Sequence, residues 1–233
     1  MAYKVRVIRK RPPCVNWPRH TRKDDMTEFP VPEPLLRRYA TGSASPGLAL
    51  LVGAQLDIAE EGRAVVADFE AAGGALLRAA PAAEMSAGAL DRVLSALDAP
   101  VAASPPPPDP GPLPQRVAIA AGCDFASIPW RFRLPGLSVH EIPGYGPEEV
   151  SLMRARPGCA LPQHTHEGEE ATLVITGAME DGGAIYRRGD LSLTDERHDH
   201  RPRIVGDEIC YCLVVLSGSL RFTGLFSRAL NYL

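Results

Sequence analysis

The sequence predicts an α+β multidomain protein, in which a small all-α N-terminal domain precedes a C-terminal all-β domain of the jelly-roll barrel type. Three observations predict this fold class: apolar residues at helical spacing before residue 98, a run of prolines at 104–114, and many short Val-, Ile- and Leu-rich segments after it. They divide the 233 residues into a disordered basic tail (1–25), a helical domain (26–103), a proline-rich linker (104–115) and a β domain (116–233).

Four short helices are expected in the N-terminal domain. The first ends at Thr41-Gly42, because glycine readily adopts the left-handed conformation that closes a helix. Ser45-Pro46 then supplies an N-cap and a first helical residue. No residue type here suggests catalysis, so we expect this domain to make contacts. The apolar faces are formed by Leu35, Leu36 and Tyr39; Leu48, Leu51, Val52 and Leu56; Val65, Val66, Phe69, Leu76 and Leu77; and Leu90, Val93, Leu94 and Leu97.

The proline run separates the two domains. It cannot be helical and lacks the amide donors that a sheet needs, so it favours an extended, semi-rigid spacer. The two domains are therefore expected to be separable. At the other end of the chain, residues 1–25 are rich in Lys and Arg, with Asp24 and Asp25 as their acidic residues. A nucleic-acid or targeting arm is one interpretation, and a disordered tail ahead of a start at Met26 is the one we favour.

Composition excludes several classes of function. The chain is 45% hydrophobic with a formal net charge of −3, which gives no general attraction to nucleic acid or membrane. Its longest apolar stretch, residues 48–54, is far shorter than the roughly 20 residues of a spanning helix. The five cysteines are scattered and odd in number, which indicates free thiols. A reducing compartment, the cytosol, is the expected location.

The C-terminal domain is predicted to be built from short strands. Segments rich in Val, Ile, Leu and aromatic residues alternate with Gly, Pro and Asp, a pattern typical of an all-β barrel or jelly roll. The predicted strands are 131–134, 139–142, 150–155, 170–176, 184–187, 190–193, 208–215 and 220–223.

A metal site is predicted where two histidines and a glutamate follow one another closely. His164 and His166 lie two residues apart, so in a strand both point to one face and can grip one ion. Glu170 lies four residues further on and can add an oxygen ligand. A fourth ligand should come from a neighbouring strand, with His200 and His198 as the candidates. Imidazole and carboxylate ligands suit zinc, iron, manganese, nickel or copper better than calcium or magnesium.

The spacing of these residues resembles the two sequence motifs of the cupin superfamily. The first motif (Gly, five residues, His-x-His, three residues, Glu, six residues, Gly) is matched without a gap by Gly158, His164, His166, Glu170 and Gly177. The second motif (Gly, five residues, Pro-x-Gly, two residues, His) is matched at its ends by Gly189 and His200, which selects His200 over His198. Asp195 and Arg197 replace its proline and second glycine, a departure that bears on the shape of the turn. The resemblance implies one divalent metal ion per chain, with zinc as the leading expectation and iron, manganese or nickel as alternatives.

Segments 128–136, 161–170, 200–202 and 220–225 in the barrel, and segments 35–42, 48–52 and 70–77 in the helices, together resemble the ChrR-type anti-sigma factors. In that family the helical domain binds an extracytoplasmic-function (ECF) sigma factor and blocks its access to RNA polymerase, and the cupin domain is needed for release under oxidative stress such as singlet oxygen. The resemblance implies a cytoplasmic transcriptional regulator without direct nucleic-acid or membrane contact, and not an enzyme.

One departure from the family concerns a second metal site. The family's helical domain normally holds a zinc ion, whose ligands at the corresponding positions are replaced here by Gln55, Ala59 and Gly62. A structural zinc contributes on the order of 10–16 kcal/mol in small modules, so short helices without it would be marginal. We expect them to be stabilised by the partner, by docking on the barrel or by better packing, unless sigma binding has been lost.

Two further alternatives stay open at this point. A metal-dependent cupin enzyme of the dioxygenase or isomerase type, with a vestigial helical domain, would need a general acid or base, and Glu180, Asp181 and Tyr186 are candidates by proximity alone. A homodimer through the barrel is also conceivable. The thiols of Cys159, Cys210 and Cys212 are expected to pack in the core rather than to sense oxidants.

Overall fold

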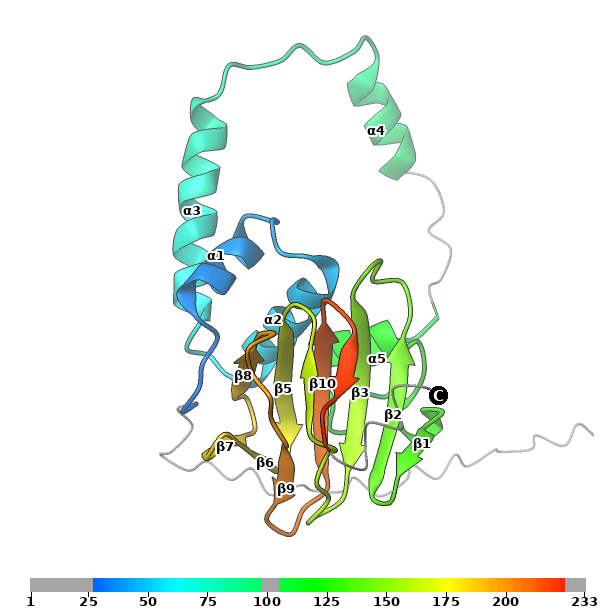
Figure 1. Cartoon of the computed structure of the whole chain (residues 1–233). Helices are drawn as coiled ribbons and strands as arrows, with labels where there is room; N and C mark the ends of the chain where they lie inside the picture. Colours follow the sequence, from blue (N-terminus) through cyan, green and yellow to red (C-terminus); the bar gives the residue numbers. More distant parts are fainter. Residues whose placement is uncertain (1–26, 98–104, 225–233) are drawn as a thin grey trace, which may run out of the picture.

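The computed structural model of the chain describes residues 27–97 and 105–224 (Figure 1). Within these residues the helices lie together at one side of a β-rich body, and two of them project from it. The predicted tail at 1–25 and the alternative start at Met26 lie outside the described residues. No helix in the described ranges is long and apolar enough to cross a membrane.

All four predicted helices are present. They are α1 (Glu33–Ala40), α2 (Pro46–Ile58), α3 (Arg63–Ala79) and α4 (Ala89–Leu97). The predicted end of α1 is confirmed, because Thr41 is its C-cap and Gly42 has a φ of +69°. Pro46 is the first residue of α2, as predicted. The structure adds a helix that the sequence analysis missed, α5 (Gln115–Ala121), and a short 3-10 helix, η1 (Phe125–Ser127).

The β-rich body contains antiparallel sheets. The largest has the strand order β1-β2-β3-β10-β5-β8, and smaller sheets are formed by β7-β6-β9 and β11-β4. The predicted strands are present. Strands β6 and β9 were not predicted, and β4 was assumed only in the argument for the metal site, because segments of three or four residues are too short to show a clear alternation. The strand bounds are β1 (Arg131–Leu134), β2 (Leu137–Ile142), β3 (Glu149–Ala155), β4 (His164–His166), β5 (Glu170–Thr176), β6 (Ala178–Asp181), β7 (Ala184–Arg187), β8 (Leu191–Thr194), β9 (Arg203–Val205), β10 (Cys210–Leu216) and β11 (Leu220–Phe222).

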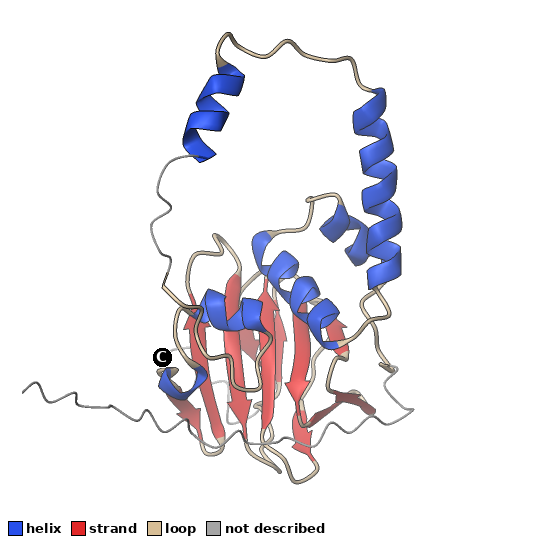
Figure 2. Ribbon diagram, turned by 180° about the vertical axis from the view of Figure 1, so that it is seen from behind, coloured by secondary structure: helices blue, strands red, loops and turns tan. Residues whose placement is uncertain are grey.

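The two faces of the large sheet serve different purposes. Because side chains alternate along a strand, Ala171, Leu173 and Ile175 of β5 pack in one hydrophobic cluster with the helices, while Val174 packs in a second cluster inside the barrel. Figure 2 shows α2 and α5 lying across the sheet face that the first cluster covers. The metal-site residues belong to the opposite, inner face.

The helices and the barrel share this first cluster, which contradicts the prediction that the two domains are separable. Leu51 and Val52 of α2 are fully buried, and each such side chain stabilises the fold by roughly 1.5–3 kcal/mol. Leu113, in the proline-rich segment, is buried in the same cluster. The proline run was expected to act as a spacer, but its end and the helix after it pack against α2. Docking on the barrel therefore stabilises α1 and α2.

Gln55 and Gly62 lie at a packed junction between the helices and the barrel. Gln55 is 1% exposed, and its Nε2 donates a hydrogen bond to the Gly189 carbonyl oxygen of the barrel at 3.4 Å. A Cβ at Gly62 would lie 2.8 Å from a Leu56 methyl and 2.9 Å from a Leu36 methyl, so the absence of a side chain lets these leucines close the space. A hydrogen bond to the barrel and apolar contacts thus hold this junction together.

Helices α3 and α4 extend away from the sheets (Figure 1). The first half of α3 packs on α1, where Val66 is buried. No residue of α4 is buried. We call residues 63–97, which comprise α3, the loop after it and α4, the arm.

Candidate metal centre

Three of the four predicted ligands meet on the inner face of the barrel. His164 lies in β4, Glu170 begins β5, and His200 lies beside His164, with which it exchanges two backbone hydrogen bonds of 2.9 and 3.0 Å. One side-chain ligand atom from each residue lies within 4.8 Å of the other two. The structure thus brings His200 beside His164 and Glu170, and binding of a metal by these residues stays a prediction.

The hydrogen bonds of the two histidines prepare one nitrogen of each for a metal. His164 Nδ1 lies 2.8 Å from the Pro162 carbonyl oxygen and so must carry the proton, which leaves a lone pair on Nε2. His200 Nδ1 lies 2.7 Å from Asp181 Oδ2, with the same consequence. His200 Nε2 is buried without any hydrogen-bond partner. A buried acceptor left unpaired beside a carboxylate and a second imidazole fits a divalent metal ion.

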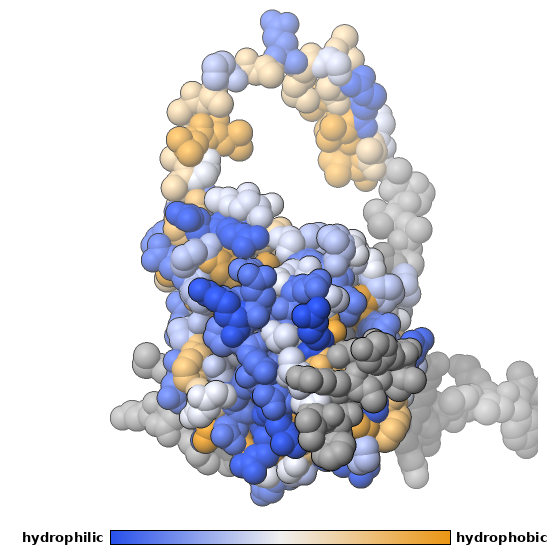
Figure 3. All heavy atoms as spheres, in the orientation of Figure 1, coloured by the Kyte–Doolittle hydropathy of each residue, from blue (hydrophilic) through white to orange (hydrophobic). Residues whose placement is uncertain are grey.

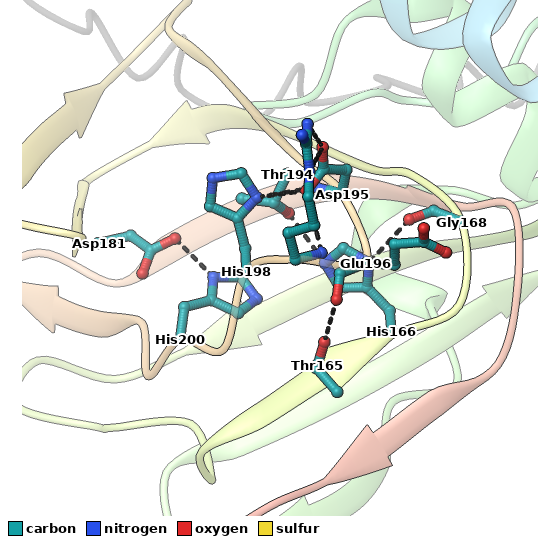
Figure 4. A network of polar contacts seen from close by, with 10 residues as sticks. Thr165, His166, Gly168, Asp181, Thr194, Asp195, Glu196, His198 and His200 are labelled. Carbon is teal, nitrogen blue, oxygen red and sulfur yellow. Dashed lines mark hydrogen bonds and ion pairs between the residues drawn. The ribbon is translucent and has the colours of Figure 1, made fainter.

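His166 is placed differently from the prediction. It is 1% exposed and its ring lies 5.7 Å from the His200 ring, but it is not one of the three grouped ligands. Its Nδ1 faces the Gly168 carbonyl oxygen at 3.1 Å, and its Nε2 accepts a hydrogen bond from the Thr194 hydroxyl at 3.0 Å (Figure 4). The Thr194 hydroxyl thus occupies the nitrogen that a metal would use.

Asp181 is a site residue that the sequence analysis did not identify as such. It is 7% exposed, and Figure 4 shows its carboxylate directed at His200 from β6. Because strand β6 was not predicted, the alternation of its side chains could not be used to predict that Asp181 faces inward. With β6 assigned, Met179 and Asp181 are the two positions that face inward, and the second is a carboxylate.

Charges at the site are mutually stabilised. Burial by itself would lower the pKa of His164, but the hydrogen bond and charge of Glu170 more than offset it, so that pKa is raised. Burial would raise the pKa of Glu170, but His164 first, and the other site histidines after it, lower that pKa overall. The carboxylate is therefore ionised at neutral pH and ready to serve as an oxygen ligand.

The turn that departs from the cupin motif is held by side chains. Asp195 accepts hydrogen bonds from the Arg197 backbone at 3.0 Å and from the Arg197 guanidinium, and its second contact is His198 Nδ1 at 2.8 Å. His198 is exposed, as expected for a surface histidine. Glu169 is directed away from the metal ligands and lines a surface cleft of about 320 Å³. The charged turn thus replaces the proline and glycine without displacing His200.

The three barrel thiols are in the core. Cys159 is 8% exposed, and burial raises its pKa. Cys210 and Cys212 are fully buried with their sulfur atoms 3.5 Å apart, and the pKa of Cys212 is raised by the hydrogen bond with Cys210 and by burial. Protonated, buried thiols react slowly, which favours a packing role.

Comparisons with known proteins place the chain in a family. A sequence profile described as "ChrR Cupin-like domain" matches residues 119–219. The "Anti-sigma-E factor ChrR" of Cereibacter sphaeroides is 30% identical over 203 residues, which cover 85% of this chain and 93% of that protein. The ChrR chain in the crystal structure of Rhodobacter sphaeroides SigE in complex with the anti-sigma ChrR superposes with a TM-score of 0.73 at 28% identity, covering 82% of this chain and all of that one. The chain therefore belongs to the ChrR family of anti-sigma factors, with N-terminal helices followed by a cupin domain.

Proposed function

We propose that this protein is a cytoplasmic anti-sigma factor that binds an ECF sigma factor through its arm, under the control of a metal-binding cupin domain. The observation that carries the proposal is the exposure of large apolar side chains on α3 and α4. They are exposed by 75% and 78% at Leu76 and Leu77, and by 50–74% at Leu90, Val93, Leu94 and Leu97. Figure 3 shows hydrophobic side chains gathered on both helices of the arm.

Such exposure has a physical cost that a partner removes. On α4 the apolar residues recur at i, i+3, i+4 and i+7, the spacing of a helix that buries one face. A folded protein rarely exposes a large contiguous apolar patch unless another surface covers it. The structural match to a ChrR chain seen in complex with SigE supports a sigma factor as that partner.

We further propose that the barrel holds one zinc ion through His164, His166, Glu170 and His200. The unpaired Nε2 of His200 and the ionised Glu170 support three of these ligands. His166 would join them if the Thr194 hydroxyl turned away from its Nε2, which costs one hydrogen bond. The signal that the barrel transmits is, by family resemblance, oxidative stress.

An enzymatic role has less support. Each acid or base named from the sequence already has a structural partner: Glu180 pairs with Arg203 at 3.2 Å, Asp181 holds His200, and the ring of Tyr186 lies 4.6 Å from that of Phe29. A homodimer through the barrel stays a prediction.

The test is binding of a co-expressed ECF sigma factor from the same organism, measured by co-purification and titration calorimetry. Replacing Val93 and Leu97 by aspartate should weaken binding by more than about 30-fold, because buried anchor residues of an interface are worth 2 kcal/mol or more. Phe132→Ser is the matched control, since Phe132 is 72% exposed but lies on β1, outside the arm. Unchanged binding by the arm variant, or no complex at all, would refute the proposal.

A further inference from the structure

The metal site and the start of α2 lie at the same end of the large sheet, on opposite faces. Strand register aligns Glu149, Leu216, Glu170 and Thr194 in one row across β3, β10, β5 and β8. Directly paired residues share a face, so this row belongs to the inner, metal-site face. Glu170 is a metal ligand in the proposed site, and the Thr194 hydroxyl contacts His166.

The next row along the same strands supports helix α2. It consists of Val150, Val215, Ala171 and Leu193, and because side chains alternate it faces outward. A Cβ added to Gly47, in the first turn of α2, would lie 2.8 Å from Val150 and 3.0 Å from Val215. The helix therefore begins in direct contact with this row. One step along β5, from Glu170 to Ala171, leads from the metal ligand to the surface that supports α2.

The barrel also caps this end of α2. The Glu148 carboxylate accepts hydrogen bonds from the Ser45 hydroxyl at 2.5 Å and from the Gly47 backbone N–H at 2.8 Å. Ser45 does not cap the helix with its own side chain. A carboxylate at a helix N-terminus is favourable both as an acceptor and because of the helix dipole. Glu148 directly precedes β3, whose first residue lies in the row of Glu170.

We propose that the first turn of α2, seated on the Val150–Val215–Ala171 row and capped by Glu148, is the element through which the metal state of the barrel changes the helical part of the protein. This inference rests on the proposed metal site and anti-sigma function. Metal binding would fix Glu170 and with it the end of β5, and a fixed β5 would hold the outward row in the position that fits Gly47. Loss of the metal would loosen that seat, and α1 and the arm would follow α2.

The opposite end of α2 provides a matched control. There Asp57 pairs with Arg116 of α5 through two hydrogen bonds of 2.7 and 3.0 Å. This pair also joins α2 to the rest of the body, but Asp57 lies in the last turn of the helix, at the end far from Glu148. If the coupling depends on the first turn of α2, breaking the Asp57–Arg116 pair should not change zinc affinity.

The experiment is hydrogen exchange on the full-length protein, zinc-loaded and chelator-treated. We expect metal removal to lower protection of the amides at residues 47–52 more than that of the amides at 115–121. Because coupling between two sites is reciprocal, Glu148→Ala should weaken zinc binding, by about 5-fold or more, and Asp57→Ala should not. Glu148→Gln, which keeps an acceptor, should fall between Glu148→Ala and the wild type.

Equal protection of residues 47–52 in both metal states, or equal zinc affinity of the wild type and Glu148→Ala, would overturn the inference. The wild-type exchange comparison remains decisive if a variant does not fold. Both readouts use zinc alone, so they are independent of sigma binding. A chain that binds zinc and shows the coupling but captures no sigma factor would reject the proposed partner and retain the inference.

Discussion

Asp181 orients His200, and replacing its carboxylate should weaken metal binding without removing any ligand. In Asp181→Asn an oxygen can still accept the proton of His200 Nδ1, but the negative charge is lost. In Asp181→Leu both the charge and the acceptor are lost, and the imidazole is free to rotate or to change tautomer. The two variants therefore separate charge from orientation.

The expected magnitude follows from the contact. The bond between His200 Nδ1 and Asp181 Oδ2 is 2.7 Å long, and both side chains are less than a tenth exposed. Removing such a partner of a metal-binding histidine typically costs 10–100-fold in metal affinity, which is about 1.4–2.8 kcal/mol. We expect Asp181→Leu to fall in this range and Asp181→Asn to lie nearer the wild type.

The assay is competition for zinc with a chromophoric chelator, supported by the visible spectrum of the cobalt-substituted protein. Glu180→Gln is the control, because Glu180 is next to Asp181 in β6 but is directed outward toward Arg203. If Asp181→Leu binds zinc within about twofold of the wild type, the reasoning is wrong. A purely structural role would lower the stability of the metal-free protein and leave zinc affinity and the cobalt spectrum unchanged.

Four other predictions concern the site and the core. Elemental analysis should find one zinc per chain, lost in His164→Ala and His200→Ala; a metal-free wild type would contradict the site. Zinc affinity should fall on acidification. Because the pKa of His164 is raised, the fall should start at a higher pH than it would for a site built on a histidine of ordinary pKa, whereas Glu170, with its lowered pKa, stays ionised. A zinc affinity that does not depend on pH would refute this. The same shifts mean that the His164–Glu170 ion pair stabilises the metal-free protein. This stabilisation should be complete between the ordinary pKa values of 4.5 and 6.5, and it should be lost at higher pH as His164 deprotonates and at lower pH as Glu170 protonates. Denaturant titration across pH would detect the change in the free energy of unfolding. Leu51→Ala should lower the free energy of unfolding by about 2–5 kcal/mol and shift helix and barrel signals together; a separate helical transition would show independent domains.

The sequence was most informative where spacing maps directly onto strand geometry. His164, Glu170 and His200 could be assigned because each lies at a fixed interval from a glycine. Asp181 could not, since its contact with His200 depends on how β6 is placed, and four residues with one large apolar side chain carry little strand signal. The hydrogen bond from the Thr194 hydroxyl to His166 Nε2 could not be predicted either, because it joins residues 28 positions apart in the sequence.

The docking of α2 had a sequence signal that was not used. Residues 46–58 carry only two polar side chains, Gln55 and Asp57, and a helix that is apolar around most of its circumference is expected to be largely buried. A proline-rich run seemed to separate the domains, but proline restricts only the backbone it occupies. It does not prevent the helices on either side of it from meeting, as α2 and α5 do through Gly53, where a side chain would collide with Arg116.

Ala59 and Gly62 offer no side-chain ligand for a metal, and docking on the large sheet supplies the stability that an ion would give at this place. A zinc ion in a small helical module would supply stability that does not depend on the barrel. With Gln55, Ala59 and Gly62 in its place, α1 and α2 are held by the large sheet, by the Glu148 cap and by a hydrogen bond to Gly189. The stability of the helices then depends on the conformation of the sheet that carries Glu170. The stability of the helices is thereby tied to the state of the barrel, as the coupling proposed above requires.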